Sequence, residues 1–321
     1  MHRLAILDDY QGVALALADW GRLPSDVEIE VFREHLGEPA AVAKALAGFD
    51  IVVSMRERTP FGEELFAALP DLALLVTTGM RNRSIDLAAA ERHGVVVCGT
   101  GGTGSATVDL VWGLIIAVLR NIPREDATVR AGGWQVGVGR ELEGRTLGVV
   151  GLGNIGTRMV EIGRAFRMDP IAWSPNLTAE RAAAAGVPRV ERDELLARAD
   201  VVTIHLVLGE RTRGLIGARE LALMKPDAYL VNTSRGPIVD EAALIDVLGR
   251  GAIAGAALDV FDREPLPLDH PLRRLPNTVL TPHIGYVAQD AYAVFFEQAL
   301  EDVEAFLRGS PVRLLEPAGA L

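Results

Sequence analysis

Polar side chains suited to acid–base chemistry follow directly on short apolar runs in the second half of the chain. Histidine exchanges protons near neutral pH, a carboxylate can stabilise its protonated form, and arginine binds a carboxylate through two parallel hydrogen bonds. This combination suits proton transfer to a substrate that is itself an anion. The residues are His205, Arg235, Glu264 and His283.

These residue types predict distinct roles. His283 is the candidate acid/base, and Glu264 is the candidate partner that hydrogen-bonds the imidazole and orients it. Arg235 is the candidate for binding a substrate carboxylate. Taken singly, each side chain also has a structural explanation, and Asp262 reads as a solvated loop acid. Their place at successive predicted strand ends favours a functional set.

A glycine pattern earlier in the chain supplies a cofactor site. An apolar run at 146–150 leads into G-L-G-N-I-G, then into a segment with apolar residues at helical spacing, then into a second short run at 170–173. In this strand–turn–helix context Gly151 permits the tight turn, Gly153 admits a pyrophosphate to the backbone, and Gly156 lets helix and strand pack closely. The pattern predicts dinucleotide binding.

The sequence leaves the choice between NAD and NADP open. An NAD site usually carries Asp or Glu after the second strand, to hold the ribose hydroxyls. This chain has Ser174 there, which can bind a ribose but does not repel a 2′-phosphate. Arg158 and Arg181 are candidate partners for such a phosphate.

Strand and helix patterns alternate along the whole chain, which predicts an α/β fold with parallel sheets. In the first hundred residues we expect strands at 4–7, 27–32, 51–55, 72–77 and 95–98, and helices at 13–17, 39–46, 63–69 and 85–92. From residue 146 onward six short strands are expected, the number of a doubly wound dinucleotide domain. Ligands of such sheets bind at the carboxyl ends of the strands, so the candidate side chains meet the cofactor there. We therefore predict hydride transfer between the dinucleotide and a 2-oxo acid, with His205 lining the cofactor cleft and Asp259 accepting a hydrogen bond from a nicotinamide amide.

Composition narrows the class of protein. The chain has 321 residues, enough for two domains, and a net charge of -11, which argues against nucleic-acid binding. Its longest apolar run, 110–119, is too short for a membrane span. The single cysteine, Cys98, ends an apolar run and fits a reducing, cytoplasmic location. No metal site is predicted.

Two segments organise the domains. The glycine-rich stretch 99–104 is expected to be an interdomain hinge, because no Lys-Ser or Lys-Thr follows it as in a P-loop. A long helix is expected at 288–307, after the cofactor domain is complete. Packed back on the first domain, it gives a substrate-binding domain of residues 1–100 plus 286–321 around a cofactor domain of residues 101–285.

Several segments resemble the D-isomer-specific 2-hydroxyacid dehydrogenase family. They read T-L-G-V-V-G-L-G-N-I-G, A-D-V-V-T-I-H-L, M-K-P-D-A-Y-L-V-N-T-S-R-G-P-I-V-D-E-A-A-L, A-A-L-D-V-F-D-R-E-P-L and T-P-H-I-G, and they cover most of 144–285. The family implies a Rossmann cofactor domain inserted into a flavodoxin-like substrate domain. It also implies a small 2-oxo or D-2-hydroxy acid substrate, such as hydroxypyruvate, glyoxylate or phosphoglycerate.

The resemblance also implies roles for individual residues. The catalytic residues would be Arg235, Glu264 and His283. The loop formed by Thr78, Gly79, Met80 and Arg81 would offer backbone amides to the substrate carboxylate. Arg56 would reach the far end of the substrate. A homodimer built partly on the helix that contains Trp112 is implied as well. The implied cofactor contacts are Gly151, Gly153, Asn154, Ile155, Gly156, Thr233 and Asp259.

The chain departs from the family pattern in places. Thr107-Val108-Asp109 stands for the usual Val-Ala-Glu, Val207 replaces a proline, and Met80 stands where phosphite-oxidising relatives carry lysine. The chain ends soon after the last predicted helix, so the regulatory domain of long phosphoglycerate dehydrogenases is expected to be absent. An alternative is an NAD(H)-sensing binding protein that resembles the corepressors of this fold.

Overall fold

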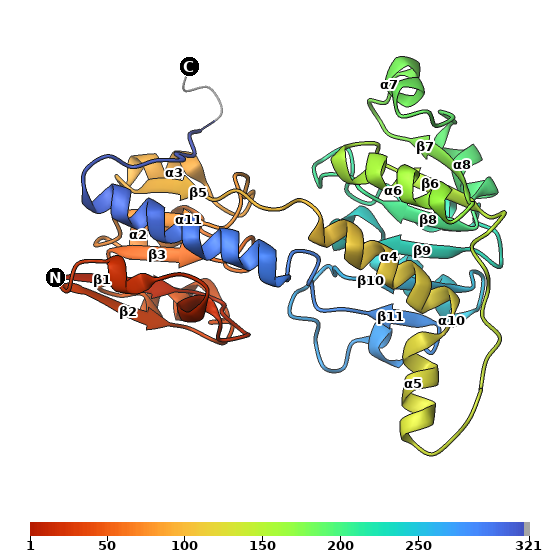
Figure 1. The fold of residues 1–321 in the computed structure, drawn as a ribbon, viewed down its shortest axis with the longest axis horizontal. Coiled ribbons are helices and arrows are strands. Elements are labelled where there is room, and N and C mark those ends of the chain that lie inside the picture. Colours follow the sequence, from red (N-terminus) through yellow and green to blue (C-terminus); the bar gives the residue numbers. More distant parts are fainter. Residues whose placement is uncertain (318–321) are drawn as a thin grey trace. The chain divides into compact units, whose positions relative to one another are not determined.

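The chain folds into two compact units, shown in Figure 1. The structure is a computed structural model and describes residues 1–317. Unit 1 comprises residues 1–103 together with 287–321, of which 318–321 lie outside the described residues, and unit 2 comprises residues 104–286. Each unit is built on one parallel sheet, as the alternation of apolar strands and helices predicts.

Unit 1 has a five-stranded sheet in the order β2-β1-β3-β4-β5, the flavodoxin-like order. Helices α1 to α3 pack against Ala5, Val52, Leu75 and Val97, which all belong to one cluster. Helix α11 contacts β4 and β5. Most of its strands read as unbroken apolar runs, as expected for a sheet covered on both faces. The elements are β1 (His2–Ile6), β2 (Val27–Val31), α1 (Pro39–Ala45), β3 (Ile51–Ser54), α2 (Glu63–Ala68), β4 (Leu74–Thr77), α3 (Leu87–Arg92), β5 (Val96–Gly99) and α11 (Gln289–Leu307).

The prediction of a helix at residues 13–17 of unit 1 is wrong. Residues 13–17 form only a 3-10 turn, η1 (Ala14–Ala16), and a second one follows, η2 (Trp20–Arg22). The Asp9 carboxylate accepts hydrogen bonds from the amides of Val13 and Ala14, and the Trp20 indole donates to the Ala14 carbonyl. These contacts stabilise a tight turn that the apolar spacing alone does not reveal.

Unit 2 has a six-stranded parallel sheet in the order β11-β10-β9-β8-β6-β7, which confirms the six expected strands. Two hydrophobic clusters show that helices cover both faces, with α4 and α6 contributing to one and α8 and α10 to the other. The strands are β6 (Thr146–Val150), β7 (Asp169–Trp173), β8 (Val201–Ile204), β9 (Tyr229–Asn232), β10 (Gly255–Leu258) and β11 (Thr278–Leu280). The helices are α4 (Ala106–Leu119), α5 (Ile122–Arg130), α6 (Asn154–Ala165), α7 (Ala179–Ala184), α8 (Arg192–Arg198), α9 (Ala218–Leu221) and α10 (Glu241–Gly249), with 3-10 turns η3 (Gly236–Ile238) and η4 (Pro271–Arg274).

The strand order of unit 2 fixes where a ligand binds. β6 lies between β7 and β8, so the connections leave in opposite directions at this point of the sheet. A crevice outside the carboxyl ends of β6 and β8 is the usual ligand position in such sheets. Among residues 1–317 no single helix is long and apolar enough to cross a bilayer, although α4 and α5, bent by 66°, pass that test when counted together.

Candidate active site

The glycine loop has the geometry that its sequence predicts. Gly151 follows β6 with φ +106°, and a Cβ there would lie 2.4 Å from the His205 carbonyl oxygen. A Cβ on Gly156 would lie 2.0 Å from the Gly151 carbonyl oxygen, whereas a Cβ on Gly153 would meet nothing within 4 Å. Gly151 and Gly156 are thus required for the turn itself, and the space over Gly153 is open.

The first turn of α6 completes this loop. The helix begins at Asn154, with Ile155 next, and Gly153 is its N-cap. The unpaired amides of a helix N-terminus carry partial positive charge and favour an anion.

Two buried polar atoms at the same sheet edge as this loop lack partners in the part of the chain that the structure describes. They are His205 Nδ1, at the end of β8, and the Thr233 hydroxyl oxygen, at the end of β9. Burial lowers the pKa of His205 to about 3, so its imidazole is neutral, and its Nε2 lies 2.9 Å from the Thr203 hydroxyl. Because buried polar groups are normally hydrogen-bonded, these orphaned atoms and the open space over Gly153 fit a bound dinucleotide.

The segment after β9 holds Arg235 through a local hydrogen-bond network. The Asn232 amide donates to the Arg235 carbonyl, and its oxygen accepts from the Ser234 amide. The Ser234 hydroxyl donates to the Ile204 carbonyl of the neighbouring strand. These contacts fix the backbone from which the half-buried Arg235 side chain projects.

The structure brings Glu264 and His283 together. Glu264 Oε2 lies 2.5 Å from His283 Nδ1, and Glu264 Oε1 accepts a hydrogen bond from the Phe261 amide. An ionised carboxylate only accepts, so Nδ1 carries the proton and Nε2 is the atom that can exchange a proton with a substrate.

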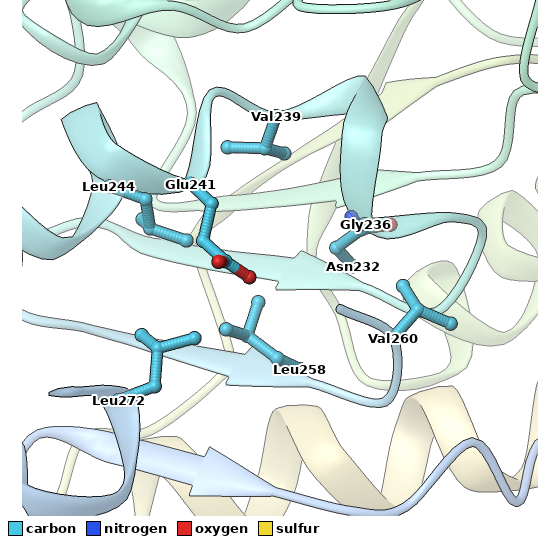
Figure 2. Close-up of a pocket in the computed structure, with 8 residues that line it drawn as sticks. All are labelled: Asn232, Gly236, Val239, Glu241, Leu244, Leu258, Val260 and Leu272. Carbon is cyan, nitrogen blue, oxygen red and sulfur yellow. The ribbon is translucent and has the colours of Figure 1, made fainter. Parts of the chain in front are cut away.

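The Arg235 and Glu264 segments pack backbone to backbone. A Cβ on Gly236 would lie 2.1 Å from the Phe261 carbonyl carbon, so no larger residue fits there without a shift. This contact sets the spacing between the chain after Arg235 and the chain before Glu264. A small pocket lies beside it, lined by Gly236, Val260, Glu241 and five neighbours (Figure 2).

His283 has an unusual backbone, with φ +53° in the left-handed region. Such a conformation is rare for a residue with a side chain and is often found at functional sites. Asp259 supports it, because Asp259 Oδ1 accepts from the Thr281 hydroxyl and the Ile284 amide, and Oδ2 accepts from the Gly285 amide. Burial raises the pKa of the Asp259 carboxyl, and these hydrogen bonds oppose the rise.

Sequence reasoning did not anticipate two contacts of this segment. It expected Asp259 to accept from a nicotinamide amide, and that stays a prediction, but both carboxylate oxygens already serve the His283 loop. Tyr286 is a further addition, with its ring edge-on to His283 at 5.6 Å between centroids. The sequence signal that could have predicted the role of Tyr286 is its position directly after T-P-H-I-G.

Ser174 directly follows β7, as the sequence predicts. Arg181 and Arg158 are the two candidate partners for a 2′-phosphate. Arg181, on α7, donates to the Leu152 carbonyl at 3.4 Å, inside the glycine loop. Arg158 donates instead to the Gly104 carbonyl. Residues 174–178 contain no carboxylate.

In unit 1 the structure brings Arg56 together with the loop that follows β4. The Arg56 amide donates to the Thr78 hydroxyl at 2.9 Å, and its guanidinium donates to the Thr78 carbonyl at 3.1 Å. The guanidinium also covers Gly79, where a Cβ would lie 1.8 Å from one of its nitrogens. The Asn82 amide donates to the Arg56 carbonyl and so ties the two loops again.

Within this loop the backbone amides differ in what they bind. The Thr78 amide donates to the Ser54 carbonyl and the Gly79 amide to the Thr100 hydroxyl, so both are engaged inside unit 1. Met80 and Arg81, which come next, are exposed.

Two doubly wound parallel sheets, one with a glycine loop at its topological switch point, define a two-domain dinucleotide-binding α/β protein. The chain belongs to the D-isomer specific 2-hydroxyacid dehydrogenase family, because residues 112–285 match the model of that family's NAD binding domain. This finding confirms the resemblance read from the sequence.

Curated relatives and solved structures agree. The chain is 38% identical to the D-3-phosphoglycerate dehydrogenase of Bacillus subtilis over 287 residues, which cover 88% of this chain and 54% of that protein. It is 39% identical to the glyoxylate reductase of Aeropyrum pernix over 256 residues, which cover 77% of this chain and 76% of that protein. The crystal structure of a phosphoglycerate oxidoreductase from Vibrio cholerae superposes with a TM-score of 0.91 at 37% identity, covering 97% of this chain and 100% of that one. The chain thus spans about half the length of the phosphoglycerate dehydrogenases that it matches.

Proposed function

We propose that this protein is an NAD(P)-dependent oxidoreductase that interconverts a small 2-oxo acid and a D-2-hydroxy acid. The contact that carries the proposal is the 2.5 Å pair of Glu264 Oε2 and His283 Nδ1, at the same sheet edge as the glycine loop. The relatives named above are dehydrogenases and reductases, so the alternative of a non-catalytic NAD(H) sensor is not favoured. Hydroxypyruvate, glyoxylate and phosphohydroxypyruvate remain the candidate substrates.

The mechanism follows from the residues at this edge. NAD(P)H supplies the hydride when it is bound. Arg235 binds the substrate carboxylate through two parallel hydrogen bonds and orients the neighbouring carbonyl. His283 donates the Nε2 proton to the carbonyl oxygen as negative charge develops on it, and Glu264 stabilises the protonated imidazole. In the reverse direction the same imidazole accepts the hydroxyl proton.

Turnover tests this proposal directly. Loss of reduced-cofactor absorbance is measured with glyoxylate, hydroxypyruvate, pyruvate and phosphohydroxypyruvate, each with NADH and with NADPH. We expect turnover of at least one acid, and a fall of about 100-fold or more for His283→Ala with cofactor affinity retained. Unchanged turnover in His283→Ala, or tight cofactor binding with no turnover of any oxo acid by the wild type, would contradict it.

We further propose that NADPH is the preferred cofactor. The absence of a carboxylate at 174–178 removes the group that repels a 2′-phosphate, and Arg181 lies at the glycine loop with a guanidinium to bind one. The ratio of kcat/KM for the two cofactors in the same assay tests this. A ratio that favours NADH would contradict it.

We propose that unit 1 is the substrate-binding domain and unit 2 the cofactor domain. Within unit 1, Arg56 and the loop 78–81 are proposed to bind the acid. Because the amides of Thr78 and Gly79 are engaged internally, those of Met80 and Arg81 are the proposed donors to the substrate carboxylate. The Arg56 guanidinium is proposed to bind the far end of the substrate.

We propose a cytoplasmic homodimer. Helix α5 buries none of its residues, and α5 and the segment that follows it expose large apolar side chains that a partner copy would cover. The exposed side chains are Ile122, Val129, Trp134, Val136 and Val138. Sedimentation velocity measures the oligomeric state.

The lone cysteine supports the proposed cytoplasmic location. Burial raises the pKa of the Cys98 thiol to about 12, so the cysteine is inert, in keeping with a reducing compartment.

A further inference from the structure

Glu241, which the proposed mechanism does not use, turns its carboxylate into the protein. It is the first residue of α10, a position where carboxylates usually face solvent, yet its side chain is only 19% exposed. Figure 2 shows its two oxygens pointing into the pocket, near Leu244 and Leu258. Placing a carboxylate among apolar side chains is costly unless hydrogen bonds satisfy its oxygens.

The two oxygens bind two other segments of unit 2. Glu241 Oε1 lies 3.0 Å from His270 Nε2, directly before η4, and His270 is also largely buried. Glu241 Oε2 accepts a hydrogen bond from the Asp262 amide at 3.3 Å. One carboxylate therefore joins the start of α10, the start of η4 and the segment that carries Glu264.

The Asp262 contact bears on the acid–base pair. Asp262 is two residues before Glu264, whose Oε1 is bound by the Phe261 amide and whose Oε2 is bound by His283. The Gly236 backbone packs against Phe261 and Asp262 as well. The segment 261–264 is thus bound both by Gly236 and by Glu241.

We infer that Glu241, held by His270, is a positioning residue for the Glu264–His283 pair. By fixing the Asp262 backbone it fixes the direction in which Glu264 projects, and so the length of its hydrogen bond to the imidazole. The inference rests on the proposed function for its catalytic consequence. A misplacement of about 1 Å in a catalytic group can cost a factor of about 100 in rate.

Three substitutions at Glu241 test this role. Glu241→Ala removes both contacts, and Glu241→Asp keeps the charge but withdraws it by one methylene from Asp262. Glu241→Gln keeps an oxygen that can accept from the Asp262 amide. We expect kcat to fall about 10- to 100-fold in the Ala and Asp variants, to fall less than about 3-fold in the Gln variant, and cofactor KM to stay within about 2-fold in all.

The control is Glu194→Ala. Glu194 lies in the first turn of α8 and forms an exposed i,i+4 pair with Arg198, so its removal is expected to change neither kcat nor the cofactor KM. Full kcat in Glu241→Asp would overturn the inference. So would equal losses in the Gln and Ala variants together with weakened cofactor binding, since that pattern marks a merely structural role.

A second readout separates this inference from the proposed function. The imidazole resonances of His283, assigned by their loss in His283→Ala, report the Glu264 contact without any turnover. They are expected to shift in Glu241→Asp and to stay in place in Glu194→Ala. A wild-type protein without turnover contradicts the proposed function, whereas unmoved His283 resonances in Glu241→Asp contradict the positioning role.

Discussion

The two sheets share a doubly wound topology but differ in chemistry at their switch points. In unit 2 the loops after β6 and β8 meet through Gly151 and the backbone of His205, whose buried imidazole is neutral. In unit 1 the switch point lies between β1 and β3, and Asp8 and Asp9 follow β1 there, both buried. The Asp8 carboxylate accepts from the Thr59 hydroxyl after β3, and the Arg58 guanidinium donates to the Asp8 carbonyl.

This difference shows why topology alone does not determine ligand binding. A pyrophosphate needs free amides and space, which the glycine loop of unit 2 provides. The switch point of unit 1 is occupied by two buried acids whose hydrogen bonds stay within the unit. In unit 1 the residues at the switch point therefore stabilise the fold, and the proposed substrate site is the loop after β4 instead.

The largest expected effect is in Gly153→Ala. The added methyl group meets no protein atom within 4 Å, so stability is expected to stay unchanged, but it occupies the space proposed for the pyrophosphate. We expect the Kd for NAD(P)H, measured by fluorescence titration, to rise about 100-fold or more. Gly249→Ala, at the exposed end of α10 with equal space, is the control. An unchanged Kd in Gly153→Ala would mean that the cofactor does not approach this glycine.

A smaller effect is expected from Asp8→Ala in unit 1. The substitution leaves the buried Thr59 hydroxyl without its acceptor and places alanine at φ +57°. We expect the free energy of unfolding in urea to fall by about 1–3 kcal/mol, with less loss in Asp8→Asn, which tolerates this backbone. The cofactor Kd is expected to stay the same. Weakened cofactor binding in a folded Asp8→Ala protein would argue against the separation of roles between the two switch points.

The last prediction concerns the pH dependence of stability and another buried acid of unit 1. Burial raises the pKa of the Asp302 carboxyl from its ordinary 3.8 to about 7, and the Arg313 guanidinium, 3.0 Å away, opposes the rise. Between these values the folded state holds a proton that the unfolded state releases. Its contribution to stability is therefore complete below about pH 4 and is lost as pH rises to about 7.

The slope of this loss is up to about 1.4 kcal/mol per pH unit for one proton. We expect Asp302→Asn to flatten the decline in unfolding free energy between pH 5 and pH 7, measured by urea denaturation. Superimposable profiles for the variant and the wild type would show that Asp302 does not titrate in this range.

Much of the fold and the grouping of candidate residues follows from sequence patterns. Both sheets, the glycine turn and the meeting of Glu264 with His283 were predictable, because apolar runs locate strands and parallel strands bring their carboxyl ends to one edge. The left-handed backbone of His283 and the inward turn of Glu241 were not. Spacing gives the position of a residue along the chain but not its loop φ or the direction of its side chain, which depend on contacts such as Asp259 with Gly285.

The return of the chain to unit 1 has a consequence for its biosynthesis. β5 ends at Gly99, but α11, which contacts β4 and β5, starts at Gln289. A ribosome therefore makes all of unit 2 before the helix that completes unit 1 emerges. Until then the nascent unit 1 lacks a helix whose Phe295, Phe296 and Leu300 are buried in the finished protein. Unit 2 is contiguous and can fold during translation, whereas unit 1 must wait with apolar surface uncovered, which makes it the part of the nascent chain that chaperones are expected to bind.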